Sequence, residues 1–126
     1  MEVIRRRLYK AGVSEASIQC DKPPRLAGKP GEAGNLVFQL PGTAAAPRRM
    51  LSAHVDTVPL CRNAKPVRRG RRIVSADKTT GLGADDRAGS AVLLAVALEL
   101  LKTKTPHPPL TFFWTVQEEV GLYGSR

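Results

Sequence analysis

The sequence has few cysteines, few aromatic residues and no long apolar stretch, and each shortage narrows the possible functions. Its two cysteines, Cys20 and Cys61, lie far apart without CxxC spacing, which excludes a cysteine-rich zinc site and favours reduced thiols over a disulfide. The longest apolar run, residues 91–101, is interrupted by Glu99 and falls short of the roughly 20 residues that cross a bilayer. The N-terminus has basic residues but no apolar segment after them, so we expect no signal peptide and a cytoplasmic protein.

Acidic residues are also outnumbered. The chain has 20 Lys+Arg against 11 Asp+Glu, a formal net charge of +9, so nucleic acid has to be considered as a partner. Most basic residues are scattered, and aromatic residues, at 5%, do not interleave with them. The one basic run, residues 65–72, contains Arg68, Arg69, Arg71 and Arg72. Solvated surface charge explains this pattern better; a basic, non-catalytic nucleic-acid-binding module stays as the alternative from another class.

The order of predicted elements indicates an α/β fold. At 126 residues the chain suits one compact domain with a real core. Apolar spacing and β-branched composition predict strands over residues 17–20, 35–40, 49–54 and 110–116. The second strand is expected to pair antiparallel with the first. A helix between the last two strands implies a right-handed crossover with parallel pairing, and therefore a mixed sheet flanked by helices.

Two helices are predicted beside these strands. The first covers residues 2–11, and the second runs from about residue 87 to 101, with Asp85 or Asp86 able to cap its first turn. Ala, Val and Leu occur on nearly every side of the second helix, so we expect it to be well buried. Residues 21–34, rich in proline and glycine, should form a loop, and a basic hairpin is possible near residues 67–74.

Three short motifs carry His and carboxylate side chains to the ends of these elements. They are Ser-Ala-His-Val-Asp-Thr-Val-Pro at residues 52–59, Gly-Ala-Asp-Asp-Arg-Ala-Gly at residues 83–89 and Trp-Thr-Val-Gln-Glu-Glu-Val-Gly at residues 114–121. Groups at strand ends converge beyond the edge of an α/β sheet. Imidazole and carboxylates without a cysteine cluster suit zinc, cobalt or manganese. The motifs therefore favour a hydrolase with two metal ions.

Each motif also has a simpler explanation. A single His such as His54 is often structural, but Asp56 two residues later offers the carboxylate that a ligating imidazole commonly bonds. The adjacent acids at 85 and 86 could merely cap a helix, yet one carboxylate can bridge two cations. Glu118 and Glu119 follow an apolar strand directly; one could bind metal while the other accepts a proton from water.

Taken together, the motifs resemble those of the cocatalytic zinc peptidases in the group of peptidase T (tripeptide aminopeptidase) and carboxypeptidase G. The resemblance rests on residues 54–59, 83–89 and 118–121 and spans about residues 35–126. It implies a three-layer-type mixed sheet flanked by helices and two zinc ions, with cobalt or manganese as other possible metals. It also implies that His54 binds one ion, Asp85 bridges both and Glu119 binds the other. Asp56 would orient His54, and Glu118 would be the general base.

The resemblance also implies that each ion is one protein ligand short. The family supplies an acid soon after the Glu pair and a late His, whereas His107 lies among prolines, where we expect it to be exposed. We therefore expect residues 1–126 to be a partial catalytic domain without the lid or dimerisation domain, binding metal weakly and turning over little. The complete protein would remove N-terminal residues from short peptides and could form a homodimer through the missing domain. A related amidohydrolase acting on acylated amino acids is the closer alternative.

Overall fold

Four strands form one mixed sheet in the computed structural model of the chain, which describes residues 1–23, 25–26, 29–31 and 33–126. The sheet has the order β1-β4-β8-β5. Its strands are β1 (Ile18–Cys20), β4 (Leu36–Leu40), β5 (Arg49–His54) and β8 (Leu110–Thr115). The central strand, β8, pairs antiparallel with β4 and parallel with β5. The predicted α/β class with a mixed sheet is confirmed.

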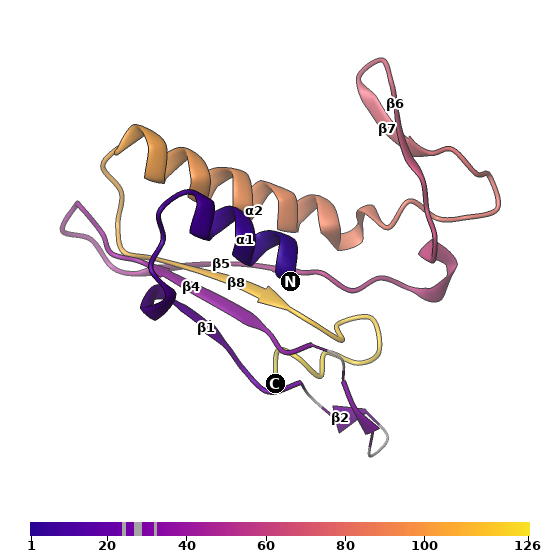
Figure 1. Cartoon of the computed structure of the whole chain (residues 1–126), viewed down its shortest axis with the longest axis horizontal. Coiled ribbons are helices and arrows are strands. Elements are labelled where there is room, and N and C mark those ends of the chain that lie inside the picture. The colour runs from indigo at the N-terminus through magenta and orange to yellow at the C-terminus, as the bar shows by residue number, and fades with distance from the viewer. Residues whose placement is uncertain (24, 27–28, 32) are drawn as a thin grey trace.

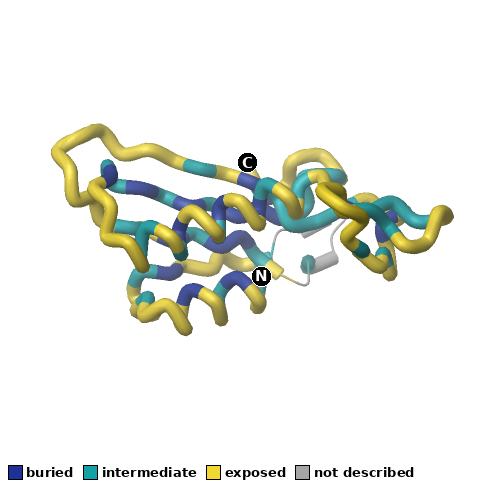
Figure 2. The backbone as a smooth tube through the Cα atoms, turned by 90° about the horizontal axis from the view of Figure 1, so that it is seen from above, coloured by how far each residue is buried: buried dark blue, intermediate teal, exposed yellow. Residues whose placement is uncertain are grey.

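Both helices cover the same face of this sheet. Helix α1 spans Glu2–Lys10 and α2 spans Ala84–Thr103, and they lie side by side over the sheet in Figures 1 and 2. Alternate residues of each strand point toward them, and these residues form one core with the inner sides of the helices. The fully buried aromatic rings of Phe38, Phe112 and Trp114 stack in a row across its centre.

Helix α2 is less buried than its composition predicts. Ser90, Leu93 and Ala97 are buried, but the side chains of Val92 and Val96 are 60% and 38% exposed. The reason is geometric: the sheet covers one side of the helix, and no described element covers the opposite side. The prediction of a helix buried on nearly every side was therefore wrong for this chain.

The start of α2 agrees with the predicted cap. Asp85 and Asp86 have non-helical backbone angles, so the regular helix begins at Arg87. The Asp86 carboxylate accepts the Gly89 N–H at 3.0 Å, which satisfies one of the unpaired donors of the first turn. Asp86 therefore has a structural role, whereas the neighbouring Asp85 side chain is exposed at the N-terminal end of the helix.

Two small hairpins stand outside the main sheet. Strands β2 (Arg25–Leu26) and β3 (Lys29–Pro30) pair within residues 21–34, which were predicted as loop; positions 24, 27–28 and 32 lie outside the described residues. The predicted basic hairpin is confirmed as β6 (Pro66–Arg69) and β7 (Arg72–Ser75), which projects away from the sheet in Figure 1. Two short 3-10 turns, η1 (Glu15–Ser17) and η2 (Pro59–Cys61), complete the elements.

The basic hairpin divides its arginines between two faces. Arg69 lies opposite Arg72 on one face, whereas Arg68 shares the other face with Ile73. The side chains are exposed, but they do not form one continuous stripe. No helix in the described part of the chain has the length and apolar character needed to cross a membrane.

The prediction of an exposed His107 was wrong. Its side chain is buried, and its Nδ1 lies 2.8 Å from the carbonyl oxygen of Pro108. His107 precedes the first residues of β8, at the opposite end of that strand from Glu118 and Glu119. It is therefore a structural residue of the loop that enters the sheet.

Candidate active site

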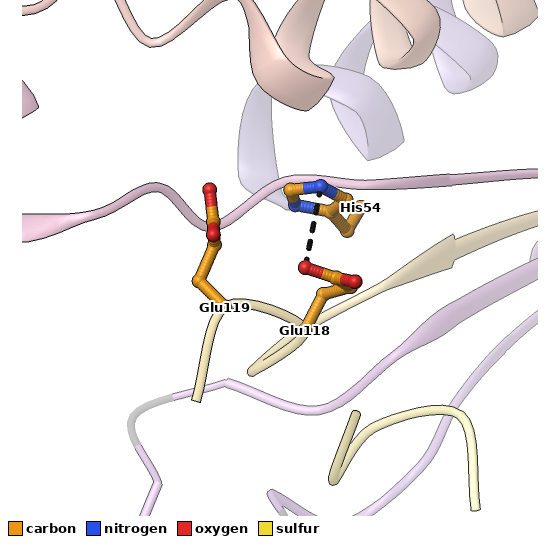
Figure 3. A group of neighbouring side chains, drawn as sticks. All are labelled: His54, Glu118 and Glu119. Carbon is orange, nitrogen blue, oxygen red and sulfur yellow. Dashed lines mark ion pairs between the residues drawn. The ribbon is translucent and has the colours of Figure 1, made fainter. Parts of the chain in front are cut away.

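The carboxyl ends of β5 and β8 bring two of the sequence motifs together. The two strands are parallel neighbours, and His54 pairs with Thr115 at the end of their ladder. His54 therefore stands beside the segment that carries Glu118 and Glu119, although about 60 residues separate them in the chain. Figure 3 shows the Glu118 carboxylate directed toward the His54 ring, with Glu119 beside it.

Three of the five predicted site residues form a group that could hold a metal ion. The ligand atoms of His54, Glu118 and Glu119 all lie within 4.8 Å of one another. His54 Nε2 is 3.7 Å from Glu118 Oε2 and 3.1 Å from Asp85 Oδ1. Asp85 thus contacts the imidazole from the start of α2, but its side chain is 87% exposed and lies outside the tighter group.

The two nitrogens of His54 have different surroundings. Nδ1 faces the backbone carbonyl of Asp56 at 3.2 Å, whereas Nε2 faces Asp85 and Glu118. A neutral imidazole that donates from Nδ1 to a carbonyl keeps its lone pair on Nε2, which is the arrangement that ligating histidines adopt. Nε2 is therefore the atom that would bind metal, and it points into the group of carboxylates.

The same surroundings favour the protonated form of the His54 imidazole. Burial opposes the charge and lowers the pKa of the imidazole. The hydrogen bonds with Asp85 and the Asp56 carbonyl, together with the negative charges of Asp56 and Glu118, outweigh that effect and raise the pKa above its ordinary value of 6.5. Because a ligating imidazole must be neutral, protons compete with a metal ion for His54, and metal affinity should fall in acid.

We expect His54 in the metal-free chain to titrate above pH 6.5. Its contribution to folding stability is then fully present below the unfolded pKa and is lost as the pH rises through the higher folded pKa. An NMR titration of the imidazole C–H signals measures the midpoint directly. Asp85→Asn should lower that midpoint, because it removes the largest favourable partner. A midpoint at or below that of an unfolded reference peptide would contradict the assignment.

Asp56 has a task that the sequence did not indicate. Its carboxylate accepts the backbone N–H groups of Glu118 and Glu119, each at 3.1 Å, and so fixes the turn that presents them. Asp56 Oδ1 stays 3.6 Å from His54 Nδ1, and the closer contact with the ring is made by the Asp56 backbone carbonyl. Asp56 therefore connects the two motifs: its backbone orients His54 and its side chain orients the glutamates.

Ser90 was missed by the sequence analysis. Its hydroxyl donates to the His54 carbonyl at 3.0 Å, and its own carbonyl accepts the Trp114 indole N–H at 3.2 Å. These two hydrogen bonds therefore connect helix α2 with strands β5 and β8 next to the site. The only available signal was a hydroxyl residue on an otherwise apolar stretch of helix.

Asn35 forms a second support. Its side-chain amide donates to Asp21 at 2.7 Å and to the Gly124 carbonyl at 2.6 Å, while its oxygen accepts the Val116 N–H at 3.0 Å. Gly124 packs so closely on Val116 that a Cβ there would overlap the Val116 backbone. This clamp closes the base of the turn that holds Glu118. The available signal in the sequence was an Asn directly before the apolar residues that form β4.

Comparison with known proteins gives a consistent result. The sequence profile of peptidase family M28 matches residues 35–126. A crystal structure of a tripeptidase from Staphylococcus aureus subsp. aureus Mu50 superposes with a TM-score of 0.82 at 34% identity, over 98% of this chain and 32% of that one. A crystal structure of aminopeptidase PepT from Bacillus cereus ATCC 10987 gives 0.77 at 35% identity, over 98% and 32%.

Among curated relatives, an uncharacterized protein, YqjE, from Bacillus subtilis (strain 168) is 38% identical over 94 residues, which are 75% of this chain and 25% of that protein. The chain therefore spans about a quarter of that relative's length and about a third of the two solved structures. The predicted resemblance to tripeptide aminopeptidases is confirmed.

Proposed function

The chain belongs to peptidase family M28, and from that premise we propose that it forms the metal-binding core of an enzyme that removes N-terminal residues from short peptides. The observation that carries the proposal is the convergence of His54, Glu118 and Glu119, with ligand atoms within 4.8 Å of one another. The similarity to a tripeptidase and to an aminopeptidase supports the choice of substrate.

The donor set fits zinc, with cobalt or manganese as alternatives. One imidazole nitrogen and carboxylate oxygens, without a thiolate, are the ligands of many hydrolytic zinc sites. In this proposal His54 Nε2 would hold one ion, Glu119 would hold a second, and Asp85, whose Oδ1 lies 3.1 Å from His54 Nε2, would bind both. When bound, the ions would polarise the scissile carbonyl and lower the pKa of water.

The remaining side chains would move a proton and hold the geometry. Glu118 lies in the same group but is assigned as the general base, which takes a proton from water and delivers it to the leaving amine. Asp56 keeps Glu118 and Glu119 in place through its two hydrogen bonds. These roles require that Glu119 binds metal and that the adjacent Glu118 does not.

Several features of the whole protein belong to the same proposal. Catalytic zinc usually has three protein ligands, so each ion needs one more ligand than this set provides, and we propose that this chain alone binds metal weakly. A lid or dimerisation domain would complete the substrate site and could form a homodimer. The free thiols of Cys20 and Cys61 support action in the cytoplasm. The division of the hairpin arginines between two faces supports a role without nucleic acid.

Metal binding by this chain tests the proposal. We expect zinc or cobalt to bind to the wild type, measured by calorimetry or by cobalt absorption, and to lose at least about 10–100-fold in affinity in His54→Ala and Glu119→Gln. Glu99→Gln is the matched control, because this exposed carboxylate lies on α2 outside the group. Equal binding by all four proteins would overturn the site.

Turnover separates the two substrate classes. The assay uses a protein that contains this chain and is long enough to be active. It should cleave a tripeptide with a free amino group and should not cleave an N-acetylated amino acid. The reverse preference would favour the amidohydrolase that acts on acylated amino acids.

A further inference from the structure

The basic hairpin of β6 and β7 carries a high positive charge and stands apart from the main sheet. Residues 65–78 contain six basic side chains and one acidic one, Asp77, whose carboxylate accepts hydrogen bonds from Thr79. Within the described ranges its two strands pair only with each other, and Figure 1 shows the hairpin projecting from the body of the molecule. A Cβ added to Gly70 in its turn would have no heavy atom within 4 Å. Nothing therefore packs against the tip at this position.

The positive charge around this turn is not neutralised within the chain. Four arginines surround the turn, and all are exposed: Arg68, Arg69, Arg71 and Arg72. None of them forms an ion pair with a carboxylate among the residues that the structure describes; Arg68 Nε donates to the Gly70 carbonyl at 2.9 Å. Arg69 lies directly opposite Arg72, and like charges in that position destabilise a strand pair. The four arginines therefore suit an anionic partner better than a role in stability.

The placement of these arginines favours a flat partner that meets the hairpin at its tip. Arg69 and Arg72 lie on one face, Arg68 lies on the other, and Arg71 is in the turn. A partner that covered one face would leave part of the charge in solvent, whereas a plane at the tip comes close to all four side chains. Attraction between exposed charges fades beyond about 8 Å at physiological salt, so only basic residues near the plane contribute. An anionic bilayer is such a plane.

Other anionic polymers fit the tip less well. No aromatic residue occurs between residues 62 and 80, so the hairpin has no ring on which a base could stack. A phosphate backbone or an acidic peptide follows a continuous line of charge, and here the charge is divided between two faces. These features favour a bilayer over nucleic acid or an acidic polypeptide.

We propose that the tip of the basic hairpin binds the surface of an anionic bilayer and holds the chain against it. This goes beyond the proposed function, because it gives the hairpin a task apart from metal binding and peptide cleavage. Each basic side chain near such a surface strengthens binding by about fivefold. Anionic lipids occupy the cytoplasmic leaflet, which agrees with action in the cytoplasm.

Sedimentation with vesicles tests the proposal without any turnover. The probes are vesicles of phosphatidylcholine containing about 30% phosphatidylserine and vesicles of phosphatidylcholine alone, each at about 0.1 M salt. We expect this chain to bind the anionic vesicles, to ignore the neutral ones and to be released at about 0.5 M salt, since salt screens the charges.

Variants of the hairpin locate the contact. Replacing all four arginines with Gln should lower the partition coefficient at least about 100-fold, and Arg71→Gln or Arg72→Gln alone should lower it about fivefold. Replacing all four with Lys keeps the charge and should keep most of the binding. The matched control neutralises four exposed basic residues of the two helices with Gln: Arg6, Arg7, Lys10 and Lys102. It has the same net charge as the hairpin variant and should bind anionic vesicles at least about 10-fold more tightly than that variant.

Several outcomes would overturn the membrane contact. They are no binding to anionic vesicles, equal binding to neutral ones, and an equal loss of binding in the helix control. Release from the vesicles by a DNA duplex or by polyglutamate, at an equal concentration of negative charge, would overturn it in favour of those partners. Cobalt binding should be the same in the wild type and in the hairpin variant. Loss of cobalt binding in the wild type would overturn the metal site and leave the membrane contact standing.

Discussion

Replacing Glu118 with Gln is expected to lower peptide turnover by about 10²–10⁴-fold, the usual contribution of general acid–base catalysis, while leaving metal affinity nearly unchanged. Gln keeps the size of the side chain and can still accept a hydrogen bond, but it cannot take a proton from water. Turnover of a tripeptide with added zinc or cobalt is the measurement, on this chain or on one extended to the length of the solved tripeptidase.

Glu119→Gln is the matched variant, because the two residues are adjacent and the same Asp56 carboxylate holds both backbones. It should lower metal affinity and turnover together, and excess metal should restore part of the activity. The comparison matters because Glu118 lies in the same group of possible ligands as Glu119. If Glu118→Gln weakens metal binding as strongly as Glu119→Gln does, then Glu118 is a ligand and the general base must be sought elsewhere.

Phe112→Ala should destabilise the fold by about 3–5 kcal/mol, the range for removing a large aromatic side chain from a core. Phe112 is fully buried and stacks between Phe38 and Trp114, so its loss opens a cavity at the centre of the sheet. Domains of this kind are stable by about 5–15 kcal/mol, so the variant would lose a large part of its stability.

Phe113→Ala provides the control for this second prediction. Phe113 is the next residue of the same strand, points to the face of the sheet without helices and is only partly buried. Its loss should cost clearly less, as measured by urea denaturation of both variants. Equal costs would mean that the face without helices contributes to the core as much as the helical face does.

Much of the fold could be predicted because its signals are local. The alternation and β-branched residues of residues 49–54 and 110–116 indicate strands directly, and the residues before Arg87 indicate a helix start. Burial of α2 was overestimated because composition does not tell which side of a helix meets a sheet. The pairing of β2 with β3 was missed because strands of two residues are too short to show an alternation of apolar and polar residues.

The site shows the same limit. His54 and the two glutamates could be placed together because His54 ends one strand, the glutamates follow another, and the two strands were predicted to be parallel. The supports could not be predicted: Ser90, Asn35 and the carboxylate of Asp56 act through hydrogen bonds to backbone atoms far away in the chain. Such bonds depend on how elements pack, and no spacing in the sequence encodes them.

The Asn35 clamp has a consequence for the order in which the protein acquires its structure. Its bonds to Asp21, Val116 and Gly124 join positions 14, 81 and 89 residues away. Contacts between such distant positions form slowly, because the entropy cost of closing a long loop comes before the contact stabilises the fold. During synthesis, a growing chain can pair β1 with β4 early, but the bond from Asn35 to the Gly124 carbonyl forms only after Gly124 has left the ribosome.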